Sequence, residues 1–348
     1  MNSACSNPGR ASGFSLIELM LAMLIGLIIM GGVMQLFIST RDTQRSSEDQ
    51  LALLADARFA IDTIAYDLRH TGLWGRHNDP AIIACQNGAA SYPCAGPAMP
   101  AATDDCAVGA YINIAAPLFA ENDNNTTLAA CASDSYKTGT DVLSLRYADT
   151  NRINDIDLAA NVAYLRTSSS VGMLFIGPTF PVGTPYNDLN APSTKYSNHL
   201  LVSRIYYVSN YTDAGDSQPS LRRGDLVAGP AGPAMNSEVL LPGVEDFQLE
   251  FGVDVGANGV AGKKDGQVDS YVNAGSVTNW SNGEVLSVRV WVLMRAERKD
   301  RDNIGSAQTF SYAGKTVTTP NDGYSRRLIS SVVKLRNTFQ VNLKQTGS

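Results

Sequence analysis

The feature that most constrains this chain is an almost uncharged apolar stretch close to its N-terminus. Residues Phe14–Ile38 read FSLIELMLAMLIGLIIMGGVMQLFI, and Glu18 is the one charged side chain among these 25 residues. A helix of that length spans about 37 Å at ~1.5 Å per residue, enough to cross a hydrocarbon core of ~30 Å. A secretory signal peptide is a poorer explanation, because its apolar run of ~7–15 residues precedes a small-residue cleavage site. Here a polar stretch, SNPGRASG, precedes the run and ends at Gly13.

Glu18 is the anomaly within this stretch. A carboxylate costs roughly 2.5–3.5 kcal/mol at the centre of a bilayer, and less near its surface, so it usually has a partner. If the chain is cut after Gly13, the new α-amine of Phe14 lies within about one helical turn of Glu18. Amine and carboxylate can then pair between staggered identical helices, which neutralises both charges and sets the axial offset. The alternative is an interfacial glutamate whose side chain reaches the lipid headgroups.

The segment from Gly13 to Met20, GFSLIELM, resembles the processing motif of type IV prepilins and of type II secretion pseudopilins. This resemblance implies a leader over residues 1–13 and cleavage between Gly13 and Phe14 by a prepilin peptidase. It also implies N-methylation of Phe14 and a role for Glu18 in recruiting and registering the subunit. We therefore expect a single-pass inner-membrane protein with its bulk in the periplasm, which enters a pilus fibre after processing.

The helical pattern continues beyond the membrane segment. We expect residues 14–38 to form a transmembrane or fibre-core helix and residues 39–75 to contain its amphipathic continuation. One apolar stripe is predicted from leucine and isoleucine residues at helical spacing: Leu51, Leu54, Ile61, Ile64 and Leu68. Gly72 and Gly75 supply a stop signal. The second half of this helix should pack on a sheet.

Residues 76–348 have a different texture, with short alternating apolar runs between turn residues, as half-buried antiparallel strands have. The predicted strands are Val142–Tyr147, Val162–Leu165, Val171–Ile176, Leu200–Ser209, Leu226–Ala228, Glu238–Val253, Val285–Ala296 and Ile329–Val341. Residues 86–105 and 177–198 are predicted to be long surface loops. The fold class is therefore α+β, and the N-terminal resemblance implies the type IV pilin fold: a long N-terminal helix packed on an antiparallel β-rich body.

Blocks within the body also resemble a family. Four blocks resemble the sequences of PilW-type minor pilins. They are DLR followed by GLWG at residues 67–75, LPGVEDFQLEFGVD at 241–254, VLSVRVWVLMRAER at 285–298 and RRLISSVVKLRN at 326–337. This implies a minor pilin at the tip or in the initiating complex of a type IV pilus, supporting assembly, twitching motility or adhesion. The implied partners are other major and minor pilins, the inner-membrane assembly platform and a tip adhesin.

Two other functions stay open. A J-type pseudopilin of a type II secretion system shares much of this layout. A membrane-anchored binding module or adhesin that keeps its leader and never polymerises is the second alternative.

The cysteines divide into two groups. Cys5 precedes the apolar segment, and four cysteines follow it within one stretch: Cys85, Cys94, Cys106 and Cys131. Four cysteines downstream of a membrane segment predict one or two disulfides in an oxidising compartment, with three pairings open. The alternative is a group of free or metal-bound thiols.

An enzyme is not expected, because the sequence holds no P-loop, HExxH or GxSxG motif and has three histidines without a recognisable catalytic context. The net charge of −6 and the pI near 5.1 argue against nucleic acid as a primary ligand.

No cofactor is required, but the turn DVGANGVAGKKDGQVD suggests a calcium site, since Ca²⁺ takes several oxygen ligands from glycine-rich loops. Its oxygen ligands would come from Asp254, Asn258, Asp265 and Asp269. Lys263 and Lys264 interrupt the pattern, and an ordinary polar loop is the alternative.

Overall fold

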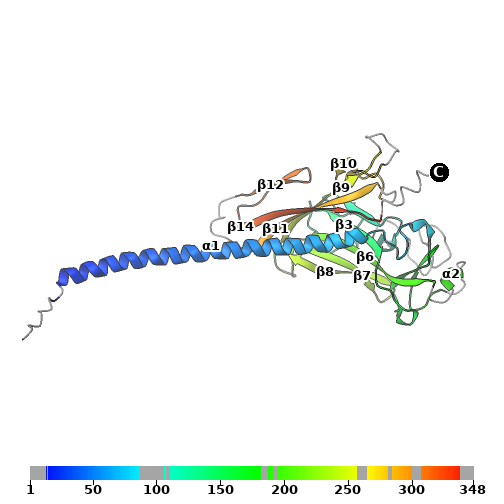
Figure 1. Cartoon of the computed structure of the whole chain (residues 1–348), viewed down its shortest axis with the longest axis horizontal. Helices are drawn as coiled ribbons and strands as arrows, with labels where there is room; N and C mark the ends of the chain where they lie inside the picture. Colours follow the sequence, from blue (N-terminus) through cyan, green and yellow to red (C-terminus); the bar gives the residue numbers. More distant parts are fainter. Residues whose placement is uncertain are drawn as a thin grey trace, which may run out of the picture. The chain divides into compact units, whose positions relative to one another are not determined.

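The computed structural model describes residues 13, 15–85, 106, 110–181, 187–190, 195–256, 265–280, 284–299 and 307–337. The chain divides into two compact units, Met1–Leu51 and Ala52–Ser348. Figure 1 shows the order of the helices and strands along the chain.

Helix α1 runs from Leu16 to His70 without a proline. Its end is fixed by Gly72, whose φ of +78° suits glycine, and by Asn337, whose side-chain amide reaches the last turn. The Asn337 Nδ2 lies 3.1–3.2 Å from the carbonyl oxygens of Arg69, His70 and Thr71. The C-terminal carbonyls that an isolated helix leaves unpaired are thereby satisfied.

The buried face of α1 differs in part from the predicted stripe. The residues that it buries are Leu53, Ala57, Ala60, Ile61, Ile64, Ala65, Asp67 and Leu68. Leu51 and Leu54 are 67% and 38% exposed, so placing them on the buried stripe was wrong. The reason is that small alanines let the helix approach the sheets closely along a face that begins at Leu53.

The larger sheet has eight strands in the order β1-β5-β4-β6-β3-β2, with β7 on β6 and β8 on β7. Its strands are β1 (Ile83–Cys85), β2 (Leu118–Glu121), β3 (Val142–Ala148), β4 (Ala163–Thr167), β5 (Gly172–Ile176), β6 (Ser197–Ser209), β7 (Ser220–Ala228) and β8 (Pro233–Pro242). Strands β1 and β5 are parallel, and the other pairs are antiparallel.

The second sheet has the order β10-β9-β11-β14, with all its pairs antiparallel. Its strands are β9 (Val244–Val253), β10 (Ser270–Val272), β11 (Val285–Lys299) and β14 (Tyr324–Lys334). A separate hairpin joins β12 (Thr309–Tyr312) to β13 (Lys315–Thr318). The short helices are η1 (Pro80–Ile82), η3 (Ala110–Ile112), η4 (Asp155–Asp157), α2 (Asn187–Asn190) and η6 (Ala274–Ser276).

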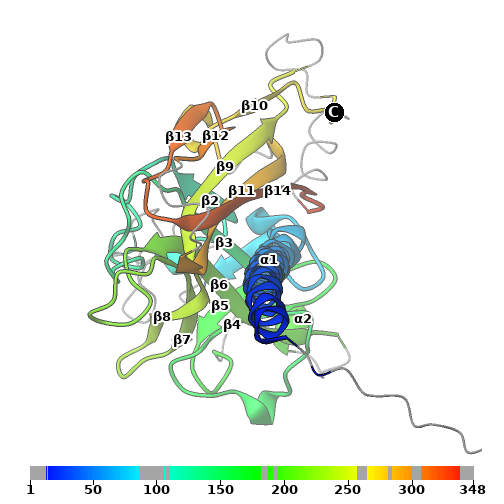
Figure 2. The ribbon, with the colours of Figure 1, turned by 90° about the vertical axis from the view of Figure 1, so that its left-hand side faces the viewer.

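The main hydrophobic core joins the C-terminal part of α1 to both sheets. It combines helix residues such as Ile64 and Leu68 with Leu145 of β3, Phe247 of β9 and Val290 of β11. Figure 2 shows β11 and β14 on one side of the C-terminal part of α1 and β6 on another. The α+β fold predicted from the sequence, a long N-terminal helix packed on antiparallel sheets, is confirmed.

Several strand predictions need correction. The predicted strand Glu238–Val253 is two strands, β8 and β9, because the chain turns at Gly243 with a φ of +81°. An added Cβ at Gly243 would lie 2.8 Å from the Arg295 carbonyl oxygen, so the turn needs glycine. Leu226–Ala228 is the end of the longer β7, and β14 starts at Tyr324, before the predicted Ile329. Residues 86–105, which were predicted to form a surface loop, lie outside the described residues.

Candidate functional sites on the helix and the body

The N-terminal part of α1 presents its apolar side chains to the outside. Exposed fractions of its large hydrophobic residues from Leu16 to Ile38 lie between 48% and 76%. Among the described helices, α1 is the one long and apolar enough to cross a membrane by length and composition. So much apolar surface is stable only when lipid or other apolar helices cover it.

The predicted processing site lies directly before this helix. Gly13 is exposed and has open space around the position where a side chain would begin. Phe14 lies outside the described residues, and Glu18 is an exposed residue in the first turn of α1. A carboxylate in a first helical turn also interacts favourably with the helix dipole. The roles of these residues in cleavage, methylation and register stay predictions.

The body is attached to α1 through a fully buried carboxylate that the sequence did not identify as special. Asp67 Oδ1 accepts hydrogen bonds from Tyr147 Oη at 2.8 Å and from Arg204 Nη1 at 2.6 Å. The Tyr206 hydroxyl donates to Asp67 Oδ2. Arg204 continues through Nε to Asp225 Oδ1 at 2.7 Å. One helix residue is thereby tied to strands β3, β6 and β7.

Burial and the charge of Asp67 shift the pKa values of the three side chains that bind this carboxylate, Tyr147, Arg204 and Tyr206. Burial, followed by the charge of Asp67, raises the pKa of Tyr206 well above that of a free tyrosine. The pKa of Tyr147 is raised for the same two reasons. Burial alone would lower the pKa of Arg204, but Asp67 outweighs it and the pKa is raised. The anchor therefore keeps both phenols protonated as donors and the guanidinium charged at neutral pH.

The cysteines of the body are placed as follows. Cys106 and Cys131 form a disulfide, and their side chains pack with Leu128 and Tyr207 in a small core beside β3 and β6. Cys85, at the end of β1, is also disulfide-bonded. Its partner lies outside the described residues, as does Cys94. The disulfide between Cys106 and Cys131 closes a loop that includes β2, the strand at one edge of the larger sheet.

The turn predicted to bind calcium is described only in part, and Asn258 lies outside the described residues. Asp254 is 1% exposed; its Oδ2 accepts from Gly266 N at 2.7 Å, whereas its Oδ1 has no hydrogen-bond partner among the described residues. Asp269 Oδ2 accepts from Val255 N at 2.9 Å, and Asp265 is exposed. In the described part of the chain, no group of three or more His, Cys, Asp or Glu side chains could hold a metal ion.

The histidines serve as hydrogen-bonding groups of the body. His70 and His77 contact the carbonyl oxygens of Tyr66 and Ser168, each at 2.7 Å. His199 is 5% exposed; its Nδ1 lies 2.7 Å from the Asp149 carbonyl oxygen and its Nε2 2.8 Å from Ser197 Oγ.

The protonation of His199 follows from these partners. A carbonyl oxygen only accepts, so Nδ1 carries the proton, and in the neutral ring Nε2 accepts from Ser197. Burial lowers the pKa of His199 and favours that neutral form. Both ring nitrogens are thus engaged in positioning strand β6.

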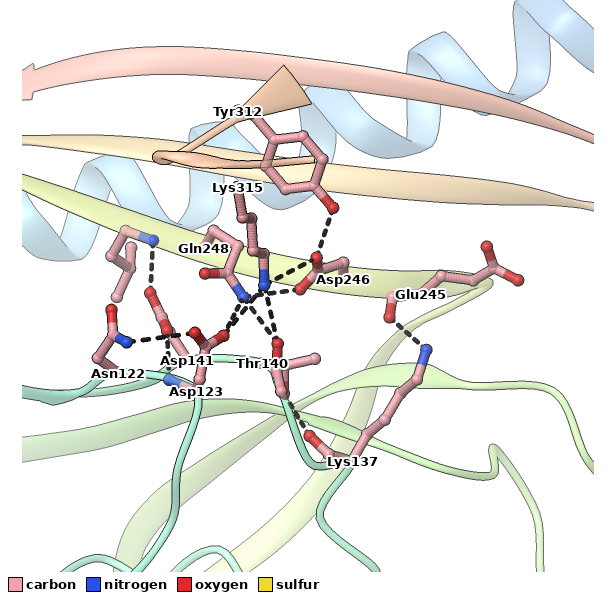
Figure 3. Close-up of polar contacts among 12 residues, drawn as sticks. Asn122, Asp123, Lys137, Thr140, Asp141, Glu245, Asp246, Gln248, Tyr312 and Lys315 are labelled. Carbon is pink, nitrogen blue, oxygen red and sulfur yellow. Dashed lines mark hydrogen bonds and ion pairs between the residues drawn. The ribbon is translucent and has the colours of Figure 1, made fainter. Parts of the chain in front are cut away.

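A polar cluster lies where the second sheet, the hairpin and two loops of the body meet (Figure 3). Lys315 Nζ lies 3.0 Å from Asp123 Oδ1, 2.9 Å from the Gly139 carbonyl oxygen and 3.3 Å from Asp246 Oδ2. Gln248 Nε2 lies 3.1 Å, 3.0 Å and 2.9 Å from the same three residues. An ammonium and an amide therefore share Asp123 Oδ1 and the Gly139 carbonyl oxygen, and they contact different carboxyl oxygens of Asp246.

Asp141 holds the backbone beside this polar cluster in place. It is fully buried, and its two carboxyl oxygens accept from Asp123 N at 2.8 Å and Leu249 N at 2.7 Å. Burial, its largest cause, raises the pKa of Asp141 to about 7. A cavity of about 290 Å³ adjoins the cluster and is lined partly by Lys137, Leu293 and the hairpin strand β13.

Sequence reasoning missed both the Asp67 anchor and the polar cluster. Asp67 lies 80 residues from Tyr147 and 139 from Tyr206, and Lys315 lies 192 from Asp123. The one local signal was an acidic residue at a buried helical position, three residues after Ile64 and next to Leu68. Such a carboxylate must find partners when it is buried.

Two family models match this sequence. The model described as Prokaryotic N-terminal methylation motif matches residues 9–34. The model described as Type IV Pilus-assembly protein W, PilW, matches residues 205–337, which include strands β9, β11 and β14. The resemblance recognised in the N-terminal motif and in the C-terminal blocks is confirmed.

Comparison with solved structures finds a type IV-like pilin from Thermus thermophilus. It shares 15% sequence identity, with a TM-score of 0.27, over 59% of this chain and 82% of that chain. None of the curated proteins compared matches the sequence. The matched motif implies processing by a prepilin peptidase and pilus assembly partners, and its apolar helix is consistent with the inner membrane and the pilus. The PilW family is structural and not catalytic. The two family matches show that the chain resembles a PilW-type type IV pilus assembly protein over residues 205–337 and carries an N-terminal methylation motif at residues 9–34.

Proposed function

We propose that this minor pilin occupies the tip or the initiating complex of a type IV pilus and supports twitching motility or adhesion. The observation that carries the proposal is the exposed apolar part of α1, which follows Gly13 and has Glu18 in its first turn. The body favours an end position over the repeating shaft, because its two sheets, hairpin and loops form a bulky unit from Ala52 to Ser348. The partners would be major and minor pilins, the assembly platform and a tip adhesin.

Polymerisation would be non-covalent. Burial of the α1 side chains against neighbouring apolar helices supplies cohesion, since packed apolar helices cover surface that a single subunit leaves exposed. The Glu18 carboxylate would pair with the α-amine of Phe14 in a neighbouring subunit. Because the pair neutralises two charges in apolar surroundings, it would select one axial offset.

Processing is tested by the intact mass and N-terminal sequence of the protein from membranes, beside a Gly13→Val variant. We expect the mature wild-type chain to start at methylated Phe14 and the variant to keep its leader. A wild-type chain that still begins at Met1 would instead support the anchored binding module.

Position in the fibre is tested by labelling the subunit on purified pili. Label at fibre ends is expected, and even label along the shaft would refute the tip proposal. The J-type pseudopilin alternative is separated by gene deletion: loss of pili and twitching supports the pilus function, whereas loss of protein secretion with intact pili supports the pseudopilin.

A calcium site near Asp254 is a second proposal, supported by the buried Oδ1 of that residue, which accepts no hydrogen bond from the residues that the structure describes. Asp265, Asp269 and Asn258 would supply further oxygens. Thermal unfolding of the full chain in detergent, with Ca²⁺ or with a chelator, tests it. A midpoint raised by Ca²⁺ in the wild type but not in Asp254→Asn supports the site, and equal midpoints refute it.

A further inference from the structure

The β12–β13 hairpin stands apart from the rest of the body in its backbone hydrogen bonding. In the described part of the chain, its two strands pair with each other and with no strand of the two larger sheets. An isolated two-stranded hairpin is marginally stable in water. Its position must therefore depend on side chains that dock it to the body.

The docking contacts are concentrated at the hairpin tip. Tyr312 and Lys315 are paired across the turn formed by Ala313 and Gly314, whose φ values of +48° and +73° suit a tight two-residue turn. The Tyr312 hydroxyl donates to Asp246 Oδ2. Lys315 enters the polar cluster from the same tip, so both polar anchors depend on one turn.

The two faces of the hairpin differ in chemistry. The face toward the body carries half-buried or buried side chains: Phe310, Tyr312, Lys315 and Val317. The outer face carries exposed hydroxyl side chains: Thr309, Ser311, Thr316 and Thr318. Cross-strand hydroxyl contacts of 3.2 Å and 3.3 Å tie this outer face together without contacting the body.

The acceptors for Lys315 are held in place by the body itself. Gln248 is 2% exposed and bonds Asp123, Asp246 and Gly139 from within β9. Its three contacts do not involve the hairpin. The three acceptors of the Lys315 ammonium would therefore keep their positions when Lys315 leaves. The hairpin could then bind again at the same place on the body.

We propose that the β12–β13 hairpin is a releasable clasp, which Lys315 and Tyr312 hold shut over the adjoining cavity. Opening exposes Asp246 and the loop Lys137–Thr140 and leaves both larger sheets paired, because no ladder bond between them and the hairpin has to break. The Lys315 ammonium makes charge-assisted contacts at a partly exposed position, its side chain being 26% exposed and that of Asp123 43%. Such contacts hold the clasp while leaving it sensitive to salt.

Hydrogen exchange of the full chain in detergent tests the clasp, with peptides covering residues 308–319 compared with those covering β14. In Lys315→Met, which keeps the chain length but removes the charge, we expect exchange in the hairpin to accelerate by roughly tenfold or more. Tyr312→Phe should accelerate it less. Thr316→Ser, which keeps the hydroxyl contact with Ser311 on the outer face of the same hairpin, is the matched control and should exchange as the wild type does.

Exchange of β14 decides whether any change is local. Unchanged β14 protection with a faster hairpin supports the clasp, as does faster hairpin exchange in wild-type protein when salt is raised. Hairpin protection equal to wild type in Lys315→Met would overturn it, because apolar packing alone would then hold the hairpin. Equal acceleration in β14 would also overturn it, since the hairpin would then open only with the whole body.

Discussion

Replacing Asp67 with alanine tests the anchor that joins α1 to the larger sheet. The substitution leaves the Tyr147 and Tyr206 hydroxyls and one Arg204 N–H without their acceptor. Each unsatisfied buried donor costs about 1–3 kcal/mol, but such costs are not additive within one network. Removing one partner of a buried ion pair costs about 3–5 kcal/mol.

The expected loss lies near the lower end of that range, at about 3 kcal/mol. The Arg204 side chain is 22% exposed and keeps Asp225 as a partner, so its charge is not stranded. Asp67→Asn should cost less, roughly 1–2 kcal/mol, because an amide oxygen still accepts while the other position becomes a donor.

Urea unfolding of the full chain in detergent, followed by tryptophan fluorescence, measures these differences. Trp74, Trp280 and Trp291 all lie in the body, so the signal reports its unfolding. Asp62→Asn is the matched control, since Asp62 lies on α1 with an exposed side chain, and it should change the free energy of unfolding by less than about 0.5 kcal/mol.

A loss in Asp67→Ala no larger than that of the Asp62 control would refute the reasoning. A double-mutant cycle with Tyr206→Phe gives an independent check. Coupling of about 1 kcal/mol or more is expected for groups that share one network, and additive costs would show that the hydroxyl and the carboxylate act separately.

Three further outcomes are expected. Glu18→Ala should leave cleavage after Gly13 intact but lower the subunit's incorporation into purified fibres by roughly tenfold or more, the ratio that ~1.4 kcal/mol gives; equal incorporation, measured by immunoblot, would contradict the register role. Replacing Cys106 and Cys131 together with alanine should lower the free energy of unfolding by about 2–4 kcal/mol, because their disulfide spans 25 residues; a urea midpoint equal to that of wild type would contradict this. Burial raises the pKa of Asp141 to about 7 in the folded state, which therefore binds one more proton than the unfolded state between pH ~4 and ~7. The contribution of Asp141 to the free energy of unfolding should fall as the pH rises through that window, by up to roughly 4 kcal/mol. Asp141→Asn should remove that dependence, and parallel stability–pH curves for variant and wild type would show the assignment to be wrong.

Local properties of the sequence were enough to predict the N-terminal half of α1. Its length and lack of charge require a helix in apolar surroundings, because an unpaired backbone cannot lie in lipid. The motif from Gly13 to Glu18 was likewise readable, since all its chemistry lies within one short segment. Central strands such as β3, β6 and β11 were predicted because alternation of side chains is also a local signal.

Pairing and burial were decided by the tertiary structure. The break at Gly243 was missed because the residues on both sides of it favour strands, and the turn is required by the approach of Arg295. The β12–β13 hairpin was missed because its short strands carry few large apolar residues.

The sequence by itself determined that this chain is an apolar helix followed by a β-rich body. Only the tertiary structure decided that Asp67 joins α1 to the larger sheet and that Lys315 docks the hairpin on the body. The physical reason is range. A hydrophobic period is set by neighbours along the chain, whereas a buried charge is stable only beside partners that folding brings from far along the sequence.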